Sequence, residues 1–193
     1  WTIMNKTKRK IFETSMRLFA EKGYDATSIE EITATVGVAK GTLYYHFSSK
    51  EEIFEFLVEE GVKLLKNSIS IKTDKMQNSV DKLRAITLIQ IKVLFKYENF
   101  ITIILSQIWG NDEKSKLCKK YVFEYIQMIE EIVKEGIRKE EIMQGDSNVI
   151  ASGIFGFISS SFIYKMRHEG EIDIQELFSE VDNLFIKKLA KKK

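Results

Sequence analysis

The segment Ala39–Phe47, with the sequence AKGTLYYHF, concentrates side chains that can donate hydrogen bonds to an anion or to the edge of a base. Lysine, threonine, tyrosine and histidine side chains are donors that can reach DNA phosphates and base edges. By intrinsic preference the segment is a poor helix, because it contains a glycine, a threonine and two adjacent tyrosines. Its composition therefore indicates a short helix whose exposed side contacts a partner.

A helix turns by about 100° per residue, and this angle assigns each side chain of the segment to a face. Leu43 and Phe47 lie four residues apart and, together with Ala39, define the side that packs on a core. Gly41 and Tyr45 then lie at the centre of the opposite side. A glycine at this exposed position lets another backbone approach closely. The other donors surround these two positions: Lys40, Thr42, Tyr44 and His46.

Three further residues are candidates for phosphate contacts. Thr27 and Ser28 precede a helix whose start resembles a capping box, with Thr27 as the N-cap and Glu30 three residues on. Thr27 and Ser28 are candidates because helix N-termini attract phosphate. Lys50 is a candidate because it begins the helix that follows the segment and could contact the DNA backbone. Taken singly, each of these residues could be an ordinary solvated or packing side chain. As a group around one face, they favour contact with DNA.

The rest of the chain predicts helices throughout. It has no proline and only 10 glycines, which favours long helices with short links. Two short helices joined by a glycine turn and preceded by a longer one form a helix-turn-helix, whose second helix enters the major groove. Hydrophobic periodicity predicts about nine helices, near residues 6–21, 28–36, 39–47, 49–70, 80–97, 100–109, 117–138, 147–168 and 174–188.

Charge and cysteine content narrow the class of protein. The net charge is only +2, but Lys6, Lys8, Arg9 and Lys10 crowd the start of the chain, which points weakly to a polyanion. The single cysteine, Cys118, cannot form an intramolecular disulfide and fits a reducing cytoplasm. The chain shows no nucleophile elbow, phosphate loop or metal-ligand spacing, so we expect no enzyme activity and no cofactor.

One segment raises the question of a membrane. Residues Ser147–Tyr164 carry no charge. The length of this uncharged run is close to the shortest that spans a bilayer. Serines, an asparagine and two glycines dilute its apolar character. We therefore expect a buried helix of a soluble, cytoplasmic protein and no membrane partner.

The segment YDATSIEEITATVGVAKGTLYYHFSSKEEIF resembles the N-terminal domain of the TetR/AcrR-type transcriptional repressors, and the resemblance covers about Lys6–Leu57. It implies an all-α protein, with a three-helix helix-turn-helix DNA-binding domain at residues 1–48 and a larger helical effector-binding and dimerisation domain at residues 49–193. Helix 49–70 would connect the two. The operator-facing residues would be Lys40, Gly41, Thr42, Tyr44, Tyr45 and His46, with Thr27, Ser28 and Lys50 on phosphates.

The same resemblance implies a homodimer, built from the last two helices of each subunit, on a palindromic double-stranded operator. The sequence supports this locally, because Gly153, Gly156 and Ser160 recur at helical spacing in an uncharged helix. Interior glycines cost about 1 kcal/mol each relative to alanine, which close helix packing can recover. The alternative is a core within one chain. The other candidates for this interface are Phe157, Phe162, Leu177, Val181, Leu184 and Phe185.

The family's larger domain usually encloses an effector, and an apolar small molecule is expected here. Any one of the candidate residues, taken alone, is more often part of a plain core than of a pocket wall. The candidates for the pocket are Phe95, Phe100, Ile104, Trp109, Tyr121, Tyr125, Met128 and Phe155.

The sequence therefore predicts a homodimeric DNA-binding regulator, a repressor released by a small hydrophobic effector. Two alternatives stay open. One is a DNA-binding regulator without an effector. The other is a helical protein that sequesters a ligand and carries a vestigial helix-turn-helix.

Overall fold

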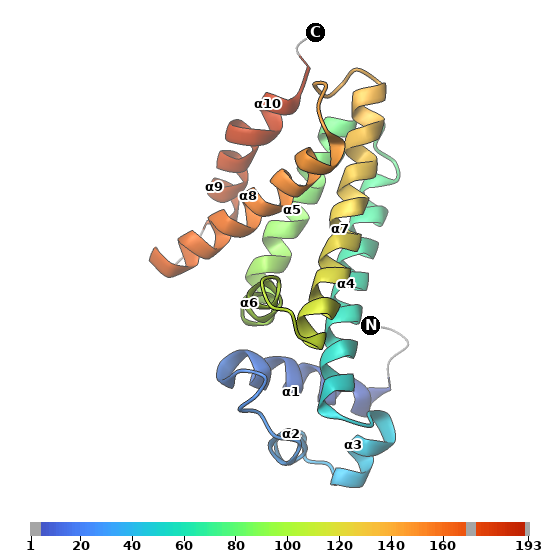
Figure 1. The fold of residues 1–193 in the computed structure, drawn as a ribbon, viewed down its shortest axis with the longest axis vertical. Helices are drawn as coiled ribbons and strands as arrows, with labels where there is room; N and C mark the ends of the chain where they lie inside the picture. The colour runs from blue at the N-terminus through green and yellow to red at the C-terminus, as the bar shows by residue number, and fades with distance from the viewer. Residues whose placement is uncertain (1–4, 169–172, 192–193) are drawn as a thin grey trace. The chain divides into compact units, whose positions relative to one another are not determined.

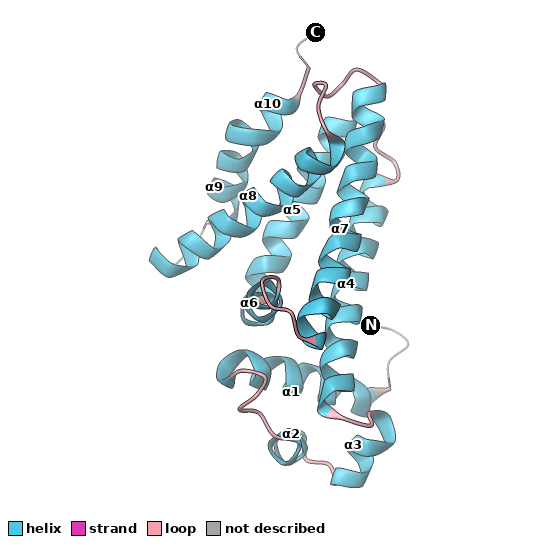
Figure 2. Ribbon diagram, in the orientation of Figure 1, coloured by secondary structure: helices cyan, strands magenta, loops and turns pink. Residues whose placement is uncertain are grey.

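Helices make up the regular structure of the chain in the computed structural model, which describes residues 5–168 and 173–191, without the side chains of residues 99, 100 and 166–168. Figure 2 shows these helices joined by short loops. Within the described residues the extended pairing is limited to one isolated bridge, between Ile142 and Ala190. The predicted all-α fold is confirmed.

The helices follow the predicted order (Figure 1). They are α1 (Lys6–Lys22), α2 (Ile29–Val36), α3 (Lys40–His46), α4 (Lys50–Thr73), α5 (Ser79–Lys96), α6 (Glu98–Gln107), α7 (Glu113–Arg138), α8 (Ser147–His168), α9 (Ile174–Val181), the π-helical turn η1 (Asp182–Ile186) and α10 (Lys187–Leu189).

The chain divides into two compact units. Unit 1 contains residues Trp1–Gly61 and Tyr97–Tyr121, and unit 2 contains Val62–Lys96 and Val122–Lys193. Two of the divisions fall inside α4 and α7, so each of these helices contributes residues to both units. Unit 1 therefore combines α1–α3 with α6 and the first turns of α4 and α7. The functional division predicted after residue 48 stays a prediction.

The core of unit 1 is built on the apolar side of α1. Asn5 caps this helix by accepting a hydrogen bond from the Thr7 amide, and the Gly23 amide closes it by donating to the Phe19 carbonyl. Helix α1 packs against both α2 and α6. Its buried side chains are Ile11, Phe12, Ser15, Leu18 and Phe19.

The start and end of α2 show how the helix-turn-helix forms. The N-cap is Ser28, whose hydroxyl accepts from the Glu31 amide at 3.1 Å, so the predicted capping box begins one residue too early. Thr27 precedes the cap. Gly37 ends the helix with φ 76° and ψ 38°, a left-handed conformation that glycine adopts without a steric penalty. The predicted glycine turn between α2 and α3 is present.

Unit 2 has a helical core in which α5 packs against α8 and α9. Inside this core three polar side chains from three helices meet. The Tyr125 hydroxyl donates to Gln90 Oε1 at 2.9 Å, and Gln90 Nε2 donates to Ser159 Oγ at 3.4 Å. All three residues are buried, so their hydrogen bonds replace those they lose to water.

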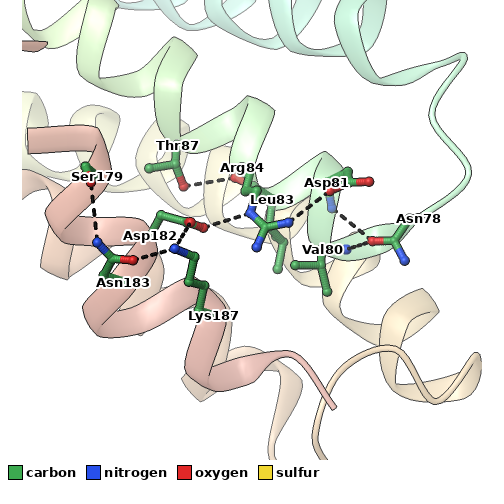
Figure 3. Close-up of polar contacts among 10 residues, drawn as sticks. All are labelled: Asn78, Val80, Asp81, Leu83, Arg84, Thr87, Ser179, Asp182, Asn183 and Lys187. Atoms are coloured by element: carbon green, nitrogen blue, oxygen red, sulfur yellow. Dashed lines mark hydrogen bonds and ion pairs between the residues drawn. The ribbon is translucent and has the colours of Figure 1, made fainter. Parts of the chain in front are cut away.

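The last predicted helix is not regular along its whole length. After α9, five residues form the π-helical turn η1. Figure 3 shows the polar contacts beside this turn, where Arg84 on α5 and Lys187 on α10 both meet the carboxylate of Asp182. π-Helical turns are rare and occur mostly as single turns inside α-helices.

Candidate nucleic-acid interface

Helix α3 separates its buried and exposed side chains as the helical angle predicted, except that Ala39, its N-cap residue, is exposed. Leu43 is 0% exposed and Phe47, its C-cap residue, is 2% exposed. On the other side Tyr45 is 85% exposed and Tyr44 is 44% exposed. A Cβ placed on Gly41 would meet no atom within 4 Å, so open space lies in front of this position. The contact of these residues with DNA stays a prediction.

Lys40 opens α3 and is paired inside the helix-turn-helix. Its Nζ contacts Glu30 Oε1 on α2 and lies 5.9 Å from the centre of the Tyr44 ring. The hydrogen bond with Glu30 raises the pKa of Lys40 and lowers the pKa of Glu30. Both side chains are exposed, and exposed ion pairs hold their partners only weakly. A phosphate could therefore replace Glu30 at little cost.

The other predicted donors of α3 are half-buried. Thr42 flanks Gly41, and His46 sits at the end of the helix with its ring 5.1 Å from that of Tyr45, edge to face. Tyr45 is thus the most exposed aromatic residue of the helix, with the His46 ring beside it.

Thr27 corrects one of the sequence predictions. Its side chain is 1% exposed, and its hydroxyl lies within hydrogen-bond distance of the Leu18 and Gly23 carbonyls, at 3.2 and 2.9 Å. The Thr27 hydroxyl is therefore buried against the end of α1 and does not face a phosphate. Ser28 is exposed, and its hydroxyl caps α2.

Lys50 is half-buried and binds the loop before α2. Its Nζ donates to the carbonyls of Tyr24 and Thr27, each at 3.0 Å, and reaches the Asp25 carbonyl at 3.5 Å. It also lies 4.4 Å from the centre of the Tyr24 ring. A phosphate contact by Lys50 stays a prediction, and such a contact would compete with these carbonyls.

Two residues outside the predicted set also hold this loop. The Tyr24 hydroxyl donates to Glu51 at 2.9 Å, and burial together with this carboxylate raises the pKa of Tyr24. Lys114, at the start of α7, lies 4.0 Å from the centre of the Tyr24 ring and 3.1 Å from Asp25 Oδ1. No local pattern links positions so distant in sequence, so sequence reasoning missed Lys114.

Comparison with known proteins identifies the family. Residues 11–57 match the family of bacterial regulatory proteins described as tetR family. A solved structure of a proposed fatty acid metabolism regulator from Clostridium perfringens is 31% identical, with a TM-score of 0.84, over 91% of this chain and 96% of that chain. This chain belongs to the TetR family.

Two further similarities bear on the TetR-family assignment. IcaR from Staphylococcus aureus, a negative transcriptional regulator of the biofilm operon icaADBC, is 41% identical over 76 residues, or 39% of this chain. That match spans only 41% of the length of IcaR. FadR from Bacillus subtilis, solved with stearoyl-CoA, has a TM-score of 0.83 at 24% identity over 92% of this chain and 97% of that chain, a likeness that shows the fold.

The predicted pocket residues of this TetR-family chain fall in both units. Within unit 2, Tyr125 is buried with its ring 6.0 Å from that of Phe155. Phe95 packs edge to face on Phe162 at 5.2 Å, and Met128 is half-buried. Unit 1 holds the rest, which are Phe100, Ile104, Trp109 and Tyr121. A pocket lined by these residues stays a prediction.

Trp109 corrects the predicted pocket. Helix α6 ends at Gln107, so Trp109 lies beyond it and is 89% exposed. The Trp109 side chain is therefore in contact with solvent and does not line a buried pocket. Ile104 and Tyr121 are buried, while the side chain of Phe100 lies outside the described residues.

The predicted dimer residues divide into core and surface. Phe162, Leu177 and Val181 are buried within unit 2, which corrects their assignment to a surface between subunits. Their burial follows from the packing of α8 and α9 with each other and on α5. The remaining members are exposed or half-buried: Gly153, Gly156, Phe157, Ser160, Leu184 and Phe185.

An intrachain contact explains one of these glycines. The rings of Phe157 and Phe185 stack with centres 5.6 Å apart and planes at 22°. A Cβ on Gly153 would lie 3.2 Å from Cζ of Phe185, so the glycine leaves room for that ring. Gly156 has no atom within 4 Å of a Cβ position and faces open space.

Helix α8 is less buried than expected. Its segment Ser147–Lys165 is long and apolar enough to cross a membrane by length and composition, and 28% of its most apolar stretch is buried. The core helix of a soluble protein can have the same length and composition, so these features are weak evidence for a span. The unburied part includes Val149, Ile163 and Tyr164, and Leu184 of η1 is exposed as well.

Cys118 has the environment of a structural residue. It is fully buried in α7, and burial raises the pKa of its thiol to about 11. The thiol is therefore protonated near neutral pH and unsuited to act as a nucleophile.

Proposed function

We propose that this TetR-family protein is a transcriptional repressor that reads an operator with α3. The observation that carries the proposal is the exposed side of α3, where Tyr45 is exposed to solvent and open space lies in front of Gly41. On the opposite side, buried Leu43 anchors the helix. A helix held in this way can enter the major groove of DNA. The name of IcaR, a negative regulator, supports repression rather than activation.

We infer that the repressor acts as a homodimer. Val149 and Tyr164 of α8 and Leu184 of η1 are exposed, and we assign them to one apolar surface between subunits. A second copy of the chain would cover this surface and give two α3 helices for a near-palindromic operator. Half-sites read by such dimers lie about one DNA turn apart, roughly 34–36 Å.

We infer further that an apolar small molecule bound in the larger domain releases the DNA. FadR of Bacillus subtilis, which shares the fold, was solved with stearoyl-CoA, and this supports a fatty acyl compound as the first ligand to test. A ligand shifts the protein only if it binds one conformation better than the other. The buried group of Tyr125, Gln90 and Ser159 offers polar contacts inside the core of unit 2.

The deciding experiment is selection of genomic fragments by the purified protein, followed by binding measurements at several salt concentrations. We expect a near-palindromic site whose affinity falls as salt rises, because phosphate contacts release counterions. Addition of acyl-CoA compounds of different chain lengths should then release the fragment.

Each part of the proposal can fail separately. Absence of any bound fragment would reject the DNA-binding function and favour a protein that sequesters a ligand. If the protein binds DNA and no acyl compound weakens this binding, the protein is a regulator without this class of effector.

A further inference from the structure

The short loop between α1 and α2 is held by two lysines from other helices. It comprises residues 23–28 and leads directly into the N-cap of α2. Lys50 from α4 binds its carbonyls, and Lys114 from α7 binds its side chains. Because the loop is so short, its position decides where α2 begins and how the helix-turn-helix is oriented.

Tyr24 is the centre of this arrangement. Its ring contacts those of Phe19 and Phe54, at 5.1 and 5.2 Å between centres, which ties the loop to the core of unit 1. The ammonium groups of Lys114 and Lys50 lie 4.0 and 4.4 Å from its centre, within the range of cation–π attraction. Tyrosine is one of the rings that favour this interaction.

Removal of Lys50 and removal of Lys114 should have different effects on the groups that these lysines contact. Lys50 donates to two half-buried backbone carbonyls, so its removal would take a donor from both, and of the two the Tyr24 carbonyl would keep the Thr27 amide at 3.3 Å. Lys114 pairs with Asp25, whose carboxylate is 91% exposed and can return to water. Loss of Lys114 should therefore loosen the loop without unfolding unit 1. Lys114 itself is only 26% exposed, so its ammonium is held in one place.

We propose that Lys114 is a positioning residue for operator binding, which it supports by fixing the Tyr24–Asp25 turn and so the start of α2. The inference rests on the proposed DNA-binding function. It extends that function to residue 114, outside both the segment 11–57 that matches the family and the predicted domain 1–48. Lys114 does not contact DNA in this proposal.

The test compares Lys114→Met with Lys114→Arg, which keeps the charge and the cation–π contact. Lys116→Met is the matched control, because Lys116 is exposed and contacts only Glu113 among the ion pairs of the described residues. Operator affinity is measured across a salt series. We expect Lys114→Met to weaken binding roughly 3- to 10-fold, the effect of losing one cation–π contact and one exposed ion pair. Lys114→Arg and Lys116→Met should stay within about 2-fold.

The salt dependence separates positioning from direct contact. Each phosphate contact contributes about 0.9 to the slope of log affinity against log salt concentration. An unchanged slope in Lys114→Met supports positioning, whereas a slope reduced by about one would show a phosphate contact and overturn the proposal.

Hydrogen exchange of the DNA-free protein gives a second measurement. We expect faster exchange in Lys114→Met at amides 24–29, with the rest of unit 1 unchanged, and recovery in Lys114→Arg. Unchanged exchange at these amides would overturn the proposal, as would faster exchange with unchanged operator affinity. Failure of the wild-type protein to bind any DNA would reject the proposed function, while the exchange experiment would still decide whether Lys114 holds the loop.

Discussion

Arg84 Nε on α5 donates to Asp182 Oδ1 at 2.8 Å, at the first residue of the π-helical turn η1 (Figure 3). Asp182 is buried, and it also meets Lys187 at 3.5 Å. Hydrogen bonding to Asp182 raises the pKa of Arg84, which keeps the guanidinium charged. The ion pair thus joins α5 to the helix that carries the exposed Leu184.

Removal of Arg84 should destabilise unit 2. In Arg84→Met, the Asp182 carboxylate loses its contact with Arg84 and keeps the one with Lys187. We therefore expect the free energy of unfolding to fall by about 1–2 kcal/mol. This loss is smaller than for a fully buried ion pair, because Arg84 is partly exposed. Denaturant titration measures it. Arg17→Met is the control, because Arg17 and Glu21 form an exposed pair on α1 that should contribute less than about 0.5 kcal/mol. Equal effects of the two substitutions would contradict this prediction.

Tyr45 should matter more for operator binding than Tyr44. Tyr45 is nearly fully exposed at the centre of the outer face of α3, whereas Tyr44 is half as exposed and lies near Lys40. We expect Tyr45→Ala to cost about 1–3 kcal/mol in binding free energy, the range of a specific base contact, and Tyr44→Ala to cost less. Fluorescence anisotropy with the selected operator measures both. The reverse order would show that α3 approaches DNA in a different orientation.

Gly41→Ala should affect thermal stability and operator affinity differently. No atom of the protein lies within 4 Å of the added Cβ, and alanine is favoured over glycine in a helix by about 1 kcal/mol. We therefore expect thermal stability to stay equal or rise, while operator affinity falls because the methyl group occupies the space left for DNA. Thermal melting and anisotropy on the same sample test both. Unchanged affinity would mean that DNA does not approach Gly41.

Leu184→Glu should prevent dimer formation. Leu184 is 64% exposed on the apolar surface that we assign to a second copy, and a glutamate charge there would have to leave water when the dimer forms. Light scattering after size-exclusion chromatography should show monomers. Phe123→Glu is the matched control, because Phe123 is 58% exposed on α7, outside that surface, and its replacement should leave the dimer intact. A dimer that survives Leu184→Glu would reject the proposed interface.

Glu135 should make stability depend on pH in acid. Hydrogen bonds from Lys139 and Lys82 hold the pKa of Glu135 at about 2, below its ordinary value of 4.5. A carboxylate with a lowered folded pKa stabilises the protein above its unfolded pKa, and this stabilisation is lost as pH falls from about 4.5 to about 2. We expect about 1 kcal/mol, reduced by solvent screening.

Comparison of Glu135→Gln with the wild type between pH 2 and pH 7 measures this contribution. The difference in unfolding free energy should be largest near neutral pH and shrink toward pH 2. A constant difference over the whole range would contradict the assigned hydrogen bonds.

The sequence by itself determined the helices and the faces of α3. Gly37 ends α2 and Leu43 anchors α3 because helix termination and helical faces depend on residues within one or two turns of each other. The same local reasoning placed the capping box one residue early, since Thr27 and Ser28 can both cap a helix. Only the packing of Thr27 against the end of α1 distinguishes them.

The tertiary structure decided which apolar and charged residues meet. Phe162 and Leu184 both looked like interface residues, yet one is buried in the chain and the other is exposed, because the packing of α5, α8 and α9 chooses between them. Lys114 reaches Asp25 across 89 positions of sequence. Such contacts depend on how distant segments fold together, and no local spacing encodes them.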